Sequence, residues 1–185
     1  MPLKLFMVLI GCKPIGRHTE QHDIYFGIAN ELKELIPEFI QFWPDAKNKM
    51  HIDGWREVTQ ANGQAISIVS RANKNNESDH QLYFINLGGY KKDILEEFHY
   101  KLIIAAVDKA AAIAISKQTA FFQHTHFENA NSHIDDKYGV DVDDIYDIED
   151  ILIPTTKEKY AIHLQPAVDL LEDELHLGYF KLNTL

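Results

Sequence analysis

An imidazole and a carboxylate stand two residues apart at several places in this chain of 185 residues. Four of these pairs fall in recurring segments: Glu20 with His22 and Glu97 with His99, and His51 with Asp53 and His133 with Asp135. Residues two apart share one face of an extended strand but not of a helix, so each pair acts jointly only where the chain is extended. Such a pair suits zinc or iron, or a general base with the group that orients it. The alternative is structural: in the two Glu-x-His pairs the Glu favours a helix start and the His packs locally, and each His-x-Asp pair lies in a turn.

Three further features of the sequence have the types and spacing of a binding site. Lys13 and Arg17 frame a basic turn, in which the backbone amides and the two cations can receive an anion. His18 and His22 are four residues apart, which in a helix would place two imidazoles on one face for a metal ion. His124 and His126 would share a face of a strand. A solvated loop or strand edge is the alternative at each place.

The elements that must position these residues are indicated by an internal repeat. Residues 5–11 (LFMVLIG) recur as residues 82–88 (LYFINLG), and the same offset carries Glu20 and His22 onto Glu97 and His99. The segment His-Ile-Asp at 51–53 returns at 133–135. We therefore expect two copies, residues 1–78 and 79–185, in one compact globule. The second copy carries an acidic insertion at residues 135–150.

Each copy is predicted to run strand, helix, strand, strand, which is an α/β or α+β fold with a mixed sheet and a pseudo-twofold arrangement. The predicted strands are 5–10, 38–43, 65–68, 82–87, 119–124 and 161–164, and the predicted helices are 19–36, 93–116 and a short C-terminal one at 166–176. A strand, helix, strand order favours parallel pairing through a right-handed crossover. Ligands bind beyond the carboxyl ends of parallel strands, where residues 11–19 and 88–92 are expected.

Composition and charge limit the classes of binding partner and the compartment that we expect for this protein. A formal net charge of -10 disfavours binding to nucleic acid phosphates. The single cysteine, Cys12, excludes an internal disulfide and suits a reducing compartment. The apolar run 5–10 is too short for a secretory signal and recurs internally, and no other apolar segment is long enough to cross a bilayer. We therefore expect a soluble, cytoplasmic protein without membrane or nucleic acid partners; a homo-oligomer stays open.

Four motifs carry a resemblance to a known family. They are Gly-Cys-Lys-Pro at 11–14, Glu-x-His-Asp at 20–23, Phe-Trp-Pro at 42–44 and His-Ile-Asp-Gly-Trp-Arg at 51–56. Together they resemble bacterial proteins of the domain-of-unknown-function family 1543, in which the domain occurs in one or two copies. The resemblance implies a bacterial origin and agrees with the repeat. It brings no activity, cofactor or catalytic residue with it.

Three functions compete on this sequence. The leading hypothesis is that strand-end loops bind a small polar or anionic molecule through Lys13, Arg17, Glu20, His22, His51, Asp53, Glu97, His99, His133 and Asp135. The second is a metal-dependent hydrolase that uses His22, His51 and Asp53, or their counterparts in the second copy. The third is an interaction module in which the acidic insertion binds a basic partner. If only one copy binds a ligand, we expect it to be the first.

Overall fold

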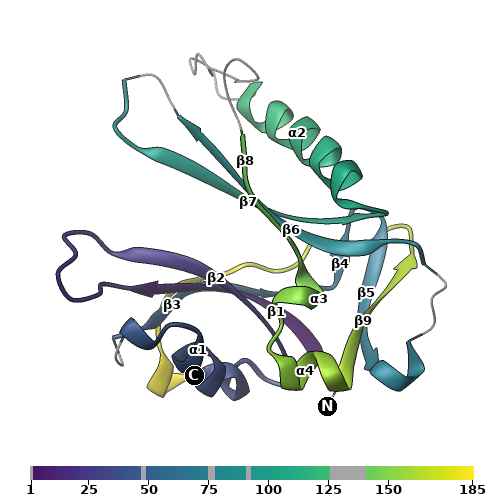
Figure 1. The fold of residues 1–185 in the computed structure, drawn as a ribbon, viewed down its shortest axis with the longest axis horizontal. Helices are drawn as coiled ribbons and strands as arrows, with labels where there is room; N and C mark the ends of the chain where they lie inside the picture. The colour runs from purple at the N-terminus through teal and green to yellow at the C-terminus, as the bar shows by residue number, and fades with distance from the viewer. Residues whose placement is uncertain (1, 47–48, 75–77, 91–92, 126–140) are drawn as a thin grey trace. The chain divides into compact units, whose positions relative to one another are not determined.

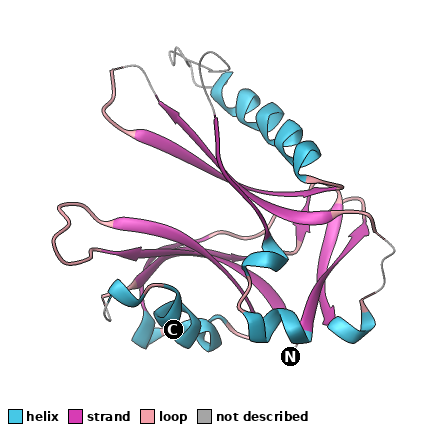
Figure 2. Cartoon of the chain, in the orientation of Figure 1, coloured by secondary structure: helices cyan, strands magenta, loops and turns pink. Residues whose placement is uncertain are grey.

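The computed structural model describes the chain except for residues 1, 47–48, 75–77, 91–92 and 126–140 (Figure 1). The chain divides into two compact units. The first unit comprises residues 1–75 and 152–185, and the second comprises residues 76–151. Sheets and helices are mixed, with few helices, and every strand pair among the described residues is antiparallel (Figure 2).

The first unit is built on a four-stranded sheet in the order β10-β3-β1-β2. The strands are β1 (Lys4–Cys12), β2 (Gln21–Ala29), β3 (His51–Glu57) and β10 (His176–Lys181). Between β2 and β3 the chain forms the 3₁₀ helix η1 (Leu32–Leu35), the helix α1 (Ile36–Phe42) and the 3₁₀ turn η2 (Pro44–Ala46). The last residues form the 3₁₀ turn η4 (Leu182–Thr184).

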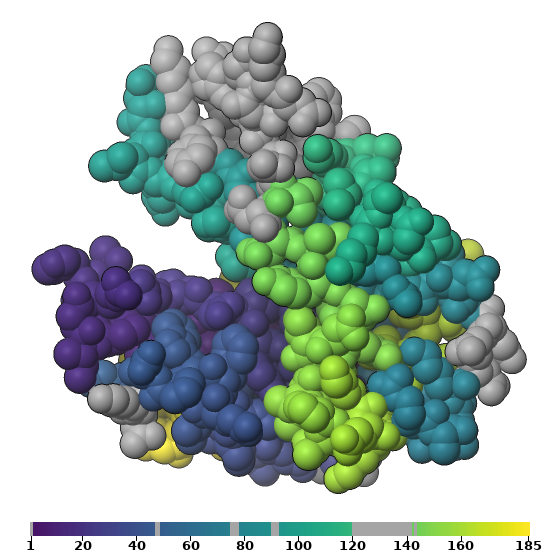
Figure 3. Space-filling view, in the orientation of Figure 1, coloured from purple at the N-terminus to yellow at the C-terminus, as the bar shows by residue number. Residues whose placement is uncertain are grey.

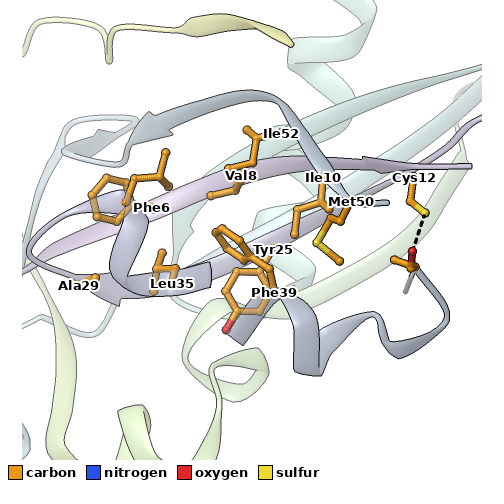
Figure 4. Packing of buried hydrophobic residues seen from close by; sticks show 12 residues of the cluster. Phe6, Val8, Ile10, Cys12, Tyr25, Ala29, Leu35, Phe39, Met50 and Ile52 are labelled. Carbon is orange, nitrogen blue, oxygen red and sulfur yellow. Dashed lines mark hydrogen bonds between the residues drawn. The ribbon is translucent and has the colours of Figure 1, made fainter. Parts of the chain in front are cut away.

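Alternate residues of β1 form the centre of the first core. Phe6, Val8, Ile10 and Cys12 are each at most 2% exposed, and because side chains alternate along a strand they all lie on one face of the sheet. Phe39 of α1 is fully buried in the same cluster (Figure 4). The short helical segment therefore closes one face of the sheet by burying apolar side chains against β1 and its neighbours.

A smaller sheet completes the first unit, with the order β4-β5-β9. Its strands are β4 (Gln60–Ala61), β5 (Gln64–Ser70) and β9 (Tyr160–Pro166), accompanied by η3 (Arg71–Asn73) and α4 (Pro154–Lys159). β4 and β5 are joined by Asn62 and Gly63, both with positive φ, as a two-residue hairpin turn requires.

The second unit is a three-stranded sheet in the order β7-β6-β8. Its elements are β6 (Gln81–Tyr90), β7 (Glu97–Ala106), α2 (Lys109–Thr125), β8 (Asp141–Asp147) and α3 (Ile148–Ile151). Tyr83, Ile85 and Leu87 alternate along β6 and form the core with Ile104 of β7 and Ala112 of α2. The helix α2 therefore covers one face of this sheet (Figure 1).

The strands predicted at 5–10, 65–68, 82–87 and 161–164 are confirmed. The helices predicted at 19–36 and 93–116 are wrong over most of their length, because 21–29 and 97–106 are strands that pair with β1 and β6. The predicted strands 38–43 and 119–124 lie in helices α1 and α2, and 166–176 forms no helix. Parallel pairing is therefore also wrong. Each unit begins with an antiparallel hairpin.

The segment that leads to β10 is held by a buried carboxylate. Asp173 has a fully buried side chain, and its Oδ1 accepts hydrogen bonds from the Thr59 backbone N–H at 3.0 Å and from the Thr59 hydroxyl at 2.6 Å. The Arg56 guanidinium lies 3.7 Å from its Oδ2. Burial lowers the pKa of Arg56, and the Asp173 carboxylate opposes that shift. The contacts tie the end of the chain to the residues that follow β3.

We expect Asp173→Ala to lower the free energy of unfolding by about 1.5–3 kcal/mol, because hydrogen bonds to a charged group are lost and Thr59 is left without its acceptor. Urea unfolding followed by tryptophan fluorescence measures this change. Both tryptophans of the chain, Trp43 and Trp55, lie in the first unit. Glu172→Ala is the matched control, because Glu172 is an exposed neighbour. Equal stability of the two variants would show that the buried contacts contribute nothing.

Candidate functional site

Two histidines flank Gly11 near the end of the central strand β1. In the antiparallel register Gly11 is opposite His22 of β2 on one side and opposite His51 of β3 on the other. Residues directly opposite one another in a sheet point to the same face. The fold therefore brings together two imidazoles that are 29 positions apart in the sequence.

Asp53 joins the two histidines through a bulge in β3. Leu9 is opposite Gly54 and Ile10 is opposite Ile52, so Asp53 is an extra residue in the ladder. A bulge of this kind changes the direction of the side chain it carries. A Cβ atom on Gly11 would lie 2.2 Å from Asp53 Oδ2 and 2.5 Å from His51 Nε2. The carboxylate and the imidazole thus occupy the space that glycine leaves open.

The resulting carboxylate and imidazole cluster contains Glu20, His22, His51 and Asp53. Asp53 Oδ2 lies 3.1 Å from His22 Nε2, and Asp53 Oδ1 lies 3.2 Å from His51 Nε2. Glu20 Oε1 lies 3.1 Å from His51 Nε2. The His51 side chain is 3% exposed, whereas that of His22 is 42% exposed. The cluster therefore has a buried end at His51 and an open end at His22.

Several buried atoms of this cluster approach one another without forming aligned hydrogen bonds. Both ring nitrogens of His51 and Oδ2 of Asp53 are inaccessible and have no hydrogen-bond partner among the described residues. Leaving a buried polar atom unpaired costs about 1–3 kcal/mol. The ring of Tyr179 stacks on His51 with centroids 4.2 Å apart, which fixes the orientation of the imidazole. Native structures keep such unpaired groups rarely, and they often mark an unseen water or ion.

A cavity of about 540 Å³ lies between α1, the start of β3 and the C-terminal residues. It is lined by Ile36, Ile40, Lys49, Met50, His51, Tyr179, Lys181, Leu182 and Asn183. Its walls combine aliphatic side chains with two lysines, and neither Lys49 nor Lys181 forms an ion pair with a residue that the structure describes. His51 belongs to both the cavity wall and the carboxylate and imidazole cluster.

Most residues that line the cavity were not predicted from the sequence. The loop between β1 and β2 lies at the surface in the purple part of Figure 3. Its residues Lys13 and Arg17 are exposed, and neither lines the cavity. His18 lies on this loop and His22 lies in a strand, so the helical face proposed for them does not exist. Lys181 and Tyr179 gave no local signal, because their role depends on the pairing of β10 with β3.

Cys12 is buried next to this region on the core side of β1. Its Sγ lies 3.7 Å from the carbonyl oxygen of Ala46, which accepts a weak hydrogen bond from the thiol (Figure 4). Burial raises the pKa of the thiol, the charge of Lys49 lowers it and the charge of Glu20 raises it. A neutral, buried thiol is a weak nucleophile, so Cys12 serves as a core residue.

The second unit has a related but different arrangement. Gly88 of β6 is opposite His99 of β7, as Gly11 is opposite His22. His99 Nε2 lies 3.9 Å from Glu97 Oε2, and His99 Nδ1 lies 3.2 Å from Asn86 Nδ2. On the other side, Gly88 is opposite Asp141. The backbone register therefore makes Asp141 the counterpart of His51.

The remaining predicted site residues fall partly beyond the described chain. His133, Asp135 and His126 lie outside the described residues. In the acidic stretch, residues 141–147 form β8 and residues 148–150 lie in α3. This part of the stretch is therefore an element of the sheet unit rather than a loop added to its surface.

The described residues contain neither a preformed metal-binding group nor a membrane-spanning helix. No group of three or more His, Cys, Asp or Glu side chains among them surrounds a common point as a bound metal ion requires in this conformation. No helix among them is long and apolar enough to cross a membrane.

Comparisons with known proteins give a family match and a structural neighbour. The model of a family described as Domain of Unknown Function (DUF1543) matches residues 17–68, a segment that includes His22, His51 and Asp53. The match supports the family resemblance of the first unit. A crystal structure of protein Il1583 from Idiomarina loihiensis is similar over 97% of both chains, with a TM-score of 0.60 and 20% sequence identity. At this identity it shows a shared fold. No curated protein matches the chain.

Proposed function

We propose that the first unit binds a small anionic molecule with an apolar part in the cavity between α1, β3 and the C-terminal residues. The observation that carries this proposal is the pair Lys49 and Lys181, which line the cavity without an ion pair to any described residue. The protein as a whole has a net charge of -10, so two unpaired cations in one cavity are a local reversal of charge. An anionic group would neutralise them.

The other walls of the cavity define the rest of the ligand. Ile36 and Ile40 stand on one side, with Met50 and Leu182, and these side chains favour an aliphatic or aromatic body. The volume of about 540 Å³ lies within the range of about 300–1,000 Å³ that small-molecule sites occupy. Asn183 and Tyr179 add polar groups that can orient the ligand.

This proposal keeps the ligand class expected from the sequence and changes its location. Of the expected ligand-binding residues that the structure describes, only His51 lines the cavity. The hydrolase and the interaction module stay predictions. The matching registers of β1 and β6, each opposite a histidine through a glycine, support the duplication that the repeat predicts. The cavity residues come from α1, the segment that leads into β3, β3 itself, β10 and η4, all in the first unit, so the proposal concerns that unit.

Isothermal titration calorimetry with octanoate, octylamine and inorganic phosphate tests the proposal. We expect octanoate to bind, phosphate to bind more weakly because it leaves the apolar wall unfilled, and octylamine not to bind because it repeats the charge of the lysines. The double variant Lys49→Gln, Lys181→Gln should weaken octanoate binding about tenfold or more, since each lost cation contact to a carboxylate contributes about 1 kcal/mol or more.

The matched control is the double variant Lys13→Gln, Arg17→Gln, which removes the same charge from the exposed loop. Octanoate affinity should be unchanged in this control. Binding of octylamine as tightly as octanoate, or an equal loss of affinity in both double variants, would contradict an anion site at the cavity. Circular dichroism spectra of both variants confirm that they are folded.

A further inference from the structure

We propose that Glu20, His22, His51 and Asp53 together form a binding site for one divalent transition-metal ion at the end of β1. Two imidazoles and two carboxylates supply nitrogen and oxygen donors, a set that suits zinc, iron(II) or manganese. This site adjoins the proposed anion cavity, and His51 belongs to both. The two proposals are tested independently, because the anion site rests on Lys49 and Lys181 and the metal site on Glu20, His22 and Asp53 with His51.

The first observation in support is that buried polar atoms of His51 and Asp53 lie close to one another without forming hydrogen bonds. Nε2 of His51 has carboxylate oxygens at 3.1 Å and 3.2 Å, yet its N–H direction fits neither, and Asp53 Oδ2 is also left without a hydrogen bond among the described residues. The His51 side chain is 3% exposed, so bulk water does not replace the missing partners. A bound cation between these donors would satisfy Nε2 and the carboxylates at once.

The second support is the spacing of the donors. Ligand atoms at about 2.0–2.1 Å from a tetrahedral ion are about 3.3 Å from one another. The nitrogen to oxygen separations in the cluster are 3.1 Å and 3.2 Å. These three separations are close to that value, but the four side chains must still rotate toward a common point, because they do not surround one in the conformation described.

The side chains that must rotate are the ones free to do so. His22 and Glu20 are each 42% exposed, and exposed side chains change rotamer within nanoseconds. His51 is held by the ring of Tyr179, and Asp53 is held by the bulge in β3. In the conformation described, the donors do not surround a common point. When a metal ion binds, the exposed side chains of Glu20 and His22 rotate toward the fixed side chains of His51 and Asp53.

Zinc titration of the purified chain, freed of any affinity tag and treated with EDTA, tests this site. We expect calorimetry to detect bound Zn²⁺, and the imidazole ¹⁵N signals of His22 and His51 to shift in NMR spectra. His22→Ala should weaken zinc binding about tenfold or more, and His22→Ala with Asp53→Asn should remove one equivalent of zinc. Manganese in place of zinc should compete for the same equivalent.

His18→Ala is the matched control, because His18 is an exposed histidine four residues from His22 that forms none of the ion pairs of the cluster. Its zinc affinity should equal that of the unaltered chain. The proposal is overturned if neither zinc nor manganese binds at 100 μM, or if the His22 and Asp53 variants bind zinc as the unaltered chain does. Because His22 is exposed, His22→Ala should fold normally, and circular dichroism checks this.

Discussion

Phe39→Ala is expected to lower the free energy of unfolding of the first unit by about 3–5 kcal/mol. Phe39 is fully buried at the centre of the first core, between α1 and the sheet. Its ring meets Tyr25 edge to face, with centroids 5.2 Å apart and planes at 83°. Removing the ring loses both its transfer from water and its packing contacts, and it leaves a cavity that short, tightly connected elements cannot close.

The effect is measured by urea unfolding, with tryptophan fluorescence reporting on the first unit through Trp43 and Trp55. Phe42→Ala is the control, because Phe42 lies on the same helix and its ring also meets Tyr25 at 5.2 Å, but it is 43% exposed. We expect Phe42→Ala to cost about half as much, because Phe42 buries only a little over half of its surface and its removal leaves no enclosed cavity. Equal losses in the two variants would mean that α1 as a whole, rather than the buried ring, determines stability.

The strands that open each unit were predictable because each is a continuous apolar run. The strands that follow them were not, and Ile24 and Ile28 show why. A spacing of four residues fits one face of a helix, but four is also an even number, so the same two residues share one face of a strand. Pairing with β1 along the whole length of β2 decided between the two. A sequence window contains no information on that partner.

In the candidate site, too, local sequence patterns predict some residues, and long-range strand pairing determines the others. The spacing of His51 and Asp53 predicts that they share a face of an extended strand. The structure places both side chains beside Gly11. His22 joins them through the antiparallel hairpin of β1 and β2, in a segment whose sequence pattern predicts a helix. Lys181 of β10 reaches the cavity through a strand pairing that spans more than a hundred residues of chain. Long-range pairing and the bulge at Asp53 leave no local pattern, so residues that depend on them could not be assigned.

Adding a side chain at Gly11 is expected to have the second large effect, because it forces the bulged strand and the carboxylate and imidazole cluster apart. A Cβ atom there would meet Asp53 Oδ2 at 2.2 Å and His51 Nε2 at 2.5 Å, both far inside van der Waals contact. Overpacking of a buried site costs about 1–3 kcal/mol and sometimes more. We expect Gly11→Ala to fall within that range and Gly11→Val, which adds two further carbon atoms, to exceed it.

A double-mutant cycle with Asp53→Ala separates this clash from a general effect of alanine in β1. The shortened side chain removes the nearest obstacle, so Gly11→Ala should cost at least about 1 kcal/mol less in the Asp53→Ala background than in the unaltered chain, as expected for residues in direct contact. Urea unfolding of the four proteins gives the coupling energy. Costs that simply add would show that Asp53 does not occupy the space above Gly11, and the cluster would then lack the geometry on which its proposed metal site depends.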